Sequence, residues 1–221
     1  YDNIIIKINI SRKTVYKLLN QRKNTTYKSK FFMRNYLKSL VLLSVLFASN
    51  ITQAAIGGDF SLIDHNNNKY SLSGSSNVKL IFFGFLNCPD VCPTTLSDVS
   101  NLLKKLEGLA KYVDPIFITI DPSRDTPELM KSYLSFFDKR IIGLTGSQEQ
   151  IEEVSNQYHV YYSYQDKEEN NNYTVNHTAN MYFLDKDNNV EKIFIPGTPF
   201  TEFYKYINRY MLKDIKNLPL Q

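Results

Sequence analysis

The chain has two cysteines, Cys88 and Cys92, and their setting favours chemistry over simple packing. The apolar run from Leu80 to Leu86 stops at Asn87-Cys88-Pro89, which is typical of a buried strand that ends in a turn. From Cys92 onward, apolar residues recur at helical spacing, and Pro93 suits the first position of a helix. We therefore expect both cysteines on the loop between a strand and a helix N-terminus.

Thiols at this position have two reactive uses. The N-terminus of a helix favours negative charge, so we expect a lowered thiol pKa, and the thiolate is both a nucleophile and a metal ligand. The spacing of Cys88 and Cys92 allows the sulfurs to share one metal ion or to close a disulfide. An inert structural disulfide is the alternative, although a disulfide stabilises most when it closes a long loop.

The chain has three histidines, and each could be structural. His65 lies in an Asn-rich turn, where we expect a solvated loop residue, and His159 is expected at the start of a strand. His177 follows the polar stretch from Tyr164 to Tyr173, which predicts a flexible loop that could bring the imidazole to the cysteines. A closed zinc site would need His65 or His159 as a fourth ligand.

The rest of the pattern predicts an α/β domain with a central sheet flanked by helices and an N-terminal hairpin. Further strands are expected at 60–63, 69–72, 114–120, 141–144, 179–184 and 190–195, with helices beginning near Pro127 and Ser147 and a closing helix over 200–211. Asp125 or Thr126 could cap the first of these helices, and Ser147 with Gln150 forms a capping box.

A polar motif, Asp121-Pro-Ser-Arg124-Asp125-Thr-Pro, follows the expected strand at 114–120. The carboxyl ends of strands in an open α/β sheet are where binding sites gather, so we expect Asp121, Arg124 and Asp125 to project there. Two interpretations remain open: a cluster of caps and ion pairs that shapes the loop, or a surface that recognises a partner.

Four stretches together resemble the Sco/SenC family over residues 56–213. They are GFLNCPDVCP, DPSRDTP, LTGSQEQI and YTVNHTANMYFLD. The resemblance implies a thioredoxin-like fold of the glutaredoxin/peroxiredoxin type with a mixed sheet, and copper bound by Cys88, Cys92 and His177. Phe85 and Leu86 replace aromatic and hydroxyl residues of the family pattern, and Asn176 replaces its usual Asp, which could alter the contacts of the imidazole.

The same resemblance implies a copper-binding assembly factor that delivers copper to the binuclear site of cytochrome c oxidase subunit II or to another exported cuproprotein. Two thiolates and one imidazole suit Cu(I), and Cu(II) is compatible when an oxygen or nitrogen ligand is added. A copper donor protein would be a second partner, and we expect a monomer. The alternative is a thiol-disulfide reductase that uses Cys88 and Cys92, and a thiol peroxidase is a weaker one.

The N-terminal part differs in composition from the rest. We expect residues 1–32 to be an untranslated or disordered extension, 33–54 a signal peptide or signal anchor, and 55–221 the thioredoxin-like domain. The segment 36–56 could act as a membrane tether. Without residues 1–54 the net charge changes from +4 to −5, so no nucleic-acid surface is expected. An exported location follows, either periplasmic, on the outer face of the inner membrane, or at the mitochondrial inner membrane.

Overall fold

The computed structural model describes residues 13, 17, 56–165 and 173–215. The chain divides into two compact units, Tyr1–Ala54 and Ala55–Gln221. The expectations for 1–32 and 33–54 and nearly all of the suggested tether at 36–56 lie outside the described residues. Within the described part, no helix combines the length and the apolar character needed to cross a bilayer.

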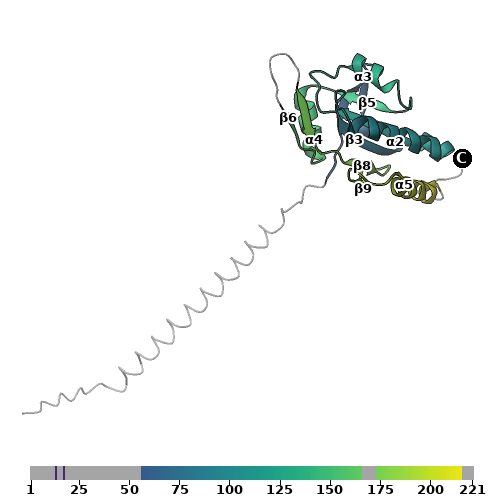
Figure 1. The fold of residues 1–221 in the computed structure, drawn as a ribbon. Helices are drawn as coiled ribbons and strands as arrows, with labels where there is room; N and C mark the ends of the chain where they lie inside the picture. The colour runs from purple at the N-terminus through teal and green to yellow at the C-terminus, as the bar shows by residue number, and fades with distance from the viewer. Residues whose placement is uncertain (1–12, 14–16, 18–55, 166–172, 216–221) are drawn as a thin grey trace, which may run out of the picture. The chain divides into compact units, whose positions relative to one another are not determined.

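A seven-stranded mixed sheet forms the centre of the second unit (Figure 1). Along the sheet the strands are β2 (Lys69–Ser71), β1 (Ser61–Asp64), β5 (Ile142–Thr145), β4 (Val113–Thr119), β3 (Val78–Gly84), β8 (Met181–Leu184) and β9 (Val190–Phe194). The neighbours β3, β4 and β5 are parallel, and the outer strands are antiparallel. The central mixed sheet and the N-terminal hairpin β1–β2 are therefore as predicted.

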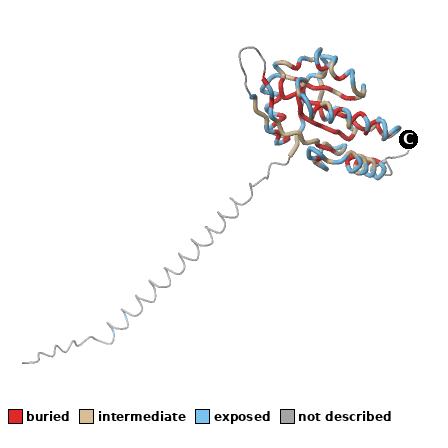
Figure 2. Tube along the Cα trace, in the orientation of Figure 1, coloured by how far each residue is buried: buried red, intermediate tan, exposed pale blue. Residues whose placement is uncertain are grey.

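Helices cover both faces of this sheet. They are α2 (Val91–Leu106), α3 (Pro127–Leu134), α4 (Gln148–Gln157) and α5 (Phe200–Ile215), with short 3-10 helices η2 (Leu72–Gly74) and η3 (Glu107–Tyr112). Because side chains alternate along a strand, β3 contributes Leu80 and Phe82 to a core with α2, α3 and α5, and Ile81 and Phe83 to a second core with α4. Figure 2 shows the buried residues concentrated in the central strands and the inner helix faces.

The helix starts follow local chemistry. Thr126 caps α3 by accepting a hydrogen bond from the Leu129 N–H, with Pro127 next to it, and Ser147 and Gln150 form the predicted capping box of α4. The start of α2 differs from the prediction, because the helix begins at Val91, two residues before Pro93. Cys92 is thus in the first turn of the helix rather than on the loop.

A second, two-stranded sheet was not predicted. It consists of β6 (Tyr162–Gln165) and β7 (Thr174–His177), which pair antiparallel on either side of residues 166–172, which lie outside the described part. No strand is expected at Thr174 to His177, and the strand expected to start at His159 begins at Tyr162 instead. His159 is exposed, with a φ of 53°, in the turn after α4.

Candidate metal centre

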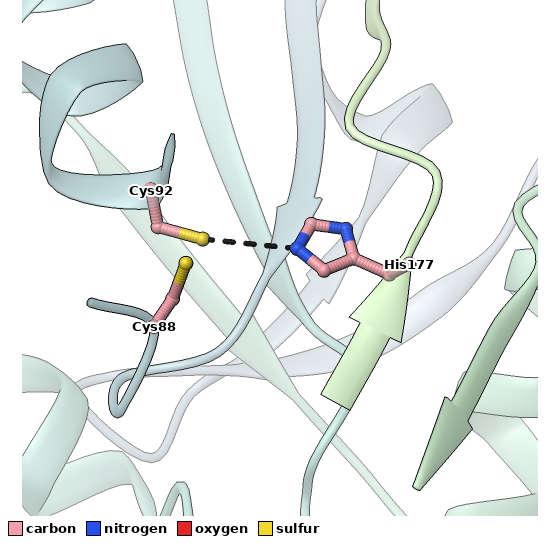
Figure 3. A group of neighbouring side chains, drawn as sticks. All are labelled: Cys88, Cys92 and His177. Carbon is pink, nitrogen blue, oxygen red and sulfur yellow. Dashed lines mark hydrogen bonds between the residues drawn. The ribbon is translucent and has the colours of Figure 1, made fainter. Parts of the chain in front are cut away.

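Three donor side chains from separate elements meet beyond the carboxyl end of β3. Cys88 lies on the loop after β3, Cys92 in the first turn of α2, and His177 is the last residue of β7. Their sulfur and ring-nitrogen atoms all lie within 4.8 Å of one another, and Cys92 Sγ is 4.0 Å from His177 Nε2. Figure 3 shows both sulfurs and the imidazole pointing to a common centre. The structure therefore brings together the three residues that the sequence singled out.

A glycine allows the close approach of Cys92 to β3. A Cβ on Gly84, the last residue of β3, would lie 2.6 Å from Cys92 Sγ and 2.8 Å from Phe117 Cε2. Real Cβ atoms essentially never make such short contacts, so any side chain at this position would push the sulfur or the Phe117 ring away. Gly84 is thus part of the site, although it offers no ligand atom.

The imidazole of His177 is held with one nitrogen toward the sulfurs. Its Nδ1 lies 3.0 Å from the Thr178 carbonyl oxygen, which can only accept, so Nδ1 carries the proton. The Nε2 lone pair then faces Cys92. Burial lowers the pKa of His177, which favours the neutral ring that a metal requires. Because a backbone carbonyl orients the ring, the exposed side chain of Asn176 is not needed for this purpose.

The expected lowering of the thiol pKa does not hold for Cys92. Its side chain is only 2% exposed, and burial raises the pKa of this thiol far above its ordinary value, with a further increase from the neighbouring Cys88. Removal from water disfavours the thiolate more than a hydrogen bond from the Phe85 backbone favours it. Cys88 is half-buried and is the more accessible of the two free thiols.

The motif after β4 lies at the carboxyl end of this strand, as expected, and its two carboxylates are buried. Asp121 is 0% and Asp125 2% exposed, and Asp121 forms an ion pair with Arg124. The Asp125 carboxylate accepts hydrogen bonds from the Thr119 hydroxyl at 2.6 Å and from the Leu86 N–H at 3.1 Å. These contacts favour the loop-shaping interpretation. They also reach the cysteine loop, which the sequence did not indicate.

The other two histidines do not join the site. His65 is half-buried rather than solvated, and its Nδ1 accepts a hydrogen bond from the Gly143 N–H at 3.0 Å. His159 is exposed beyond α4. In the part of the chain that the structure describes, the group of possible metal ligands consists of Cys88, Cys92 and His177 alone.

The donor set itself limits the choice of metal. Two sulfurs and one imidazole nitrogen form a soft set of three ligands, which Cu(I) accepts because it tolerates low coordination and prefers sulfur. Structural zinc sites in proteins are almost always closed by four ligands. The residues present therefore fit copper better than a closed zinc site.

Comparison with known proteins agrees with this arrangement. A sequence model described as SCO1/SenC matches residues 48–212. The chain belongs to the SCO1/SenC family. The SCO2-like protein of Rickettsia felis is 41% identical over 156 residues, which cover 69% of this chain and 75% of that protein. The human mitochondrial SCO2 homolog is 40% identical over 142 residues, or 62% of this chain and 53% of that protein.

Solved structures of SCO1/SenC proteins share the fold. The copper-bound ScoI of Bradyrhizobium japonicum has a TM-score of 0.65 at 39% identity, covering 71% of this chain and 99% of that one. Copper-bound yeast Sco1 has a TM-score of 0.66 at 29% identity, covering 75% and 91%. Together with the mixed sheet and flanking helices, these likenesses confirm the predicted thioredoxin-like fold and the family resemblance.

Proposed function

We propose that this protein binds one copper ion through Cys88, Cys92 and His177 and supplies it during assembly of cytochrome c oxidase. The observation that carries the proposal is the convergence of the three donor atoms within 4.8 Å. The copper-bound ScoI and Sco1 structures, which share the fold, support it. Cu(I) is the preferred ion because two of the three donors are sulfur.

The unequal exposure of the ligands supports a role in transfer. Cys92 is buried, whereas Cys88 and His177 are half-buried and lie nearer the surface. A ligand of an acceptor protein can therefore approach from the side of Cys88 and His177 while Cys92 keeps its place. We propose the binuclear copper site of oxidase subunit II, or another exported cuproprotein, as the acceptor, and a separate copper protein as the donor.

Titration of the reduced full-length protein with Cu(I), in competition with a chromophoric chelator, tests the site. We expect one copper per chain, a loss of tight binding in Cys88→Ser, and weaker binding in His177→Ala. His159→Ala is the matched control, because this exposed imidazole does not belong to the ligand group. Unchanged stoichiometry and affinity in Cys88→Ser and His177→Ala would overturn the assignment.

A thiol-disulfide reductase is the second candidate, and the arrangement of the two thiols favours it. One half-exposed and one buried thiol match the roles of an attacking and a resolving cysteine. In this reaction Cys88 would attack a partner disulfide, and Cys92 would then displace the partner thiol and close the Cys88–Cys92 disulfide. A Cys92→Ser variant that accumulates a mixed disulfide through Cys88, without copper, would favour this function over copper supply.

The cellular setting completes the proposal. We propose that residues 55–221 work outside the cytoplasm as a monomer, that residues 33–54 direct export or anchoring, and that residues 1–32 are an untranslated or disordered extension. The mitochondrial relatives are compatible with an organellar location as well. N-terminal mass spectrometry of the native protein tests the proposal for residues 1–54.

A further inference from the structure

The strand that carries His177 is separate from the main sheet. Within the described residues, β6 and β7 pair with each other and not with the seven-stranded sheet. The position of His177 relative to the cysteines therefore depends on the short link to β8, which begins at Met181, and on the side-chain contacts of this hairpin. A strand held in this way needs a specific anchor if an imidazole at its end is to stay within 4.0 Å of a sulfur.

Tyr173, which directly precedes β7, provides such an anchor and is 5% exposed. Its hydroxyl donates to Asp121 Oδ1 at 2.7 Å, and Arg124 Nη1 donates to its carbonyl oxygen at 2.9 Å. The Arg124 guanidinium also lies 3.6 Å from the centre of the Tyr173 ring. The turn after β4 therefore holds both the backbone and the side chain of Tyr173.

The same turn holds the other half of the site. Arg124 Nε donates to the buried Asp121 carboxylate, which fixes the guanidinium that stacks on Tyr173. One residue further, Asp125 accepts from the N–H of Leu86, two residues before Cys88. A single turn of five residues, Asp121–Asp125, therefore contacts both the cysteine loop and the histidine hairpin.

We propose that the turn Asp121–Asp125 positions the two halves of the metal site, with Arg124 and Asp121 holding His177 in place through Tyr173 and Asp125 holding the cysteine loop through Leu86. These are positioning residues, since they act through the segments that bear the ligands. The expected effect on copper affinity rests on the proposed function, but the anchoring of the hairpin can be measured on the metal-free protein.

The variants are chosen to weaken the anchor without touching a ligand. Arg124→Gln removes the guanidinium, and Tyr173→Phe removes only the hydroxyl that reaches Asp121 while keeping the stacked ring. Arg140→Gln is the control, because it breaks another arginine–aspartate ion pair, a more exposed one with Asp138 in the loop before β5. Circular dichroism and thermal unfolding show which variants remain folded, and Tyr173→Phe keeps the test available if Arg124→Gln does not fold.

The first readout is amide hydrogen exchange in the reduced, metal-free full chain. We expect exchange in Tyr162–Gln165 and Thr174–His177 to become faster in Arg124→Gln, and less so in Tyr173→Phe, with the main sheet unchanged. The control Arg140→Gln should leave amide exchange in the hairpin unchanged. Unchanged hairpin exchange in both folded anchor variants would overturn the inference, whether or not the protein binds copper.

The second readout is Cu(I) affinity in a double-mutant cycle with His177→Ala. We expect Arg124→Gln to weaken binding by about tenfold, as loss of outer contacts to metal ligands commonly does. His177→Ala should then lower the Cu(I) affinity much less in Arg124→Gln than in the unmodified chain, because the imidazole is no longer held near the sulfurs. Fully additive effects would show that Arg124 acts only on general stability and would overturn its positioning role. If the unmodified chain binds no copper, the proposed function fails while the exchange experiment still stands.

Discussion

Two opposing effects meet at the thiol of Cys92. Its place in the first turn of α2 favours the thiolate, and its burial favours the neutral thiol, which is the effect that prevails in the metal-free protein. A metal ion that binds there must therefore displace a proton, and a bound cation replaces the stabilisation that water cannot give. Burial thus makes Cys92 unsuitable as the thiol that first attacks a partner from solvent, and leaves it the role of a metal ligand or of a resolving thiol next to Cys88.

The buried carboxyl group of Asp125 leads to a prediction about how stability depends on pH. Burial raises the pKa of this carboxyl from 3.8 to about 6, although hydrogen bonds from Thr119 and Leu86 oppose the shift. As pH rises, the unfolded chain ionises first, so the contribution of Asp125 to stability is complete below pH ~4 and is lost as pH passes ~6. The shift in pKa corresponds to a loss of about 3 kcal/mol in the free energy of unfolding, since one pKa unit is worth ~1.4 kcal/mol.

The variant Asp125→Asn lacks this titration but keeps an oxygen that can accept from Leu86 and Thr119. We expect its free energy of unfolding, relative to the unmodified protein, to increase by about 2–3 kcal/mol between pH 4 and pH 7. Urea unfolding of both proteins at several pH values measures this difference, and other titrating groups such as Asp64 and Asp138 cancel in it. If the two proteins differed in free energy of unfolding by the same amount at pH 4 and at pH 7, the prediction would be contradicted.

At the scale of the elements, the packing of α2 against the end of β3 gives a second prediction. Gly84→Ala places a methyl group 2.6 Å from Cys92 Sγ and 2.8 Å from Phe117 Cε2, so the sulfur or the Phe117 ring must move. We expect a loss of about 1–3 kcal/mol in stability, as is usual for overpacking, together with weaker Cu(I) binding. Chemical unfolding and chelator competition measure the two effects.

Gly108→Ala is the control for this substitution. A Cβ at Gly108 meets nothing within 4 Å, so the same chemical change should leave both stability and copper binding nearly unaltered. If Gly84→Ala behaved like Gly108→Ala, the close approach of Cys92 to β3 would not matter for the site.

The elements also show what the sequence could and could not predict. The cysteine loop was predictable because its signals are local: a buried apolar run, a turn, and leucines at helical spacing. In the second sheet, β7 was not predicted, and β6 begins at Tyr162 rather than at His159, because each strand has four residues of mixed polarity, with alternating burial only in β7. The contacts of Asp125 with Leu86 and of Asp121 with Tyr173 join distant segments, so no local pattern could reveal them.

At the scale of the domain, the site lies near both hydrophobic cores. Leu86 packs against the core with α2, α3 and α5, Cys88 packs against the core with α4, and Tyr173 and Val175 belong to that second core. The site lies beyond the carboxyl ends of the parallel strands β3 and β4, where sites in α/β folds gather. The sequence suggested His177 through the preceding polar loop and the family resemblance, but no local pattern could place it at the cysteines, because 85 residues separate it from Cys92.

That separation leads to a prediction about copper and stability. A ligand that binds the native state alone stabilises it by about 2.7 kcal/mol when its free concentration is a hundred times Kd, and binding to the unfolded chain reduces the gain. Cys88 and Cys92 remain neighbours after unfolding, so they can still hold Cu(I), whereas His177 is brought to them only by the fold. We therefore expect Cu(I) to raise the unfolding midpoint of the reduced protein clearly, and of His177→Ala much less. Calorimetry of both proteins with and without Cu(I) measures the shift, and equal shifts would mean that the folded state adds nothing to what the two cysteines bind by themselves.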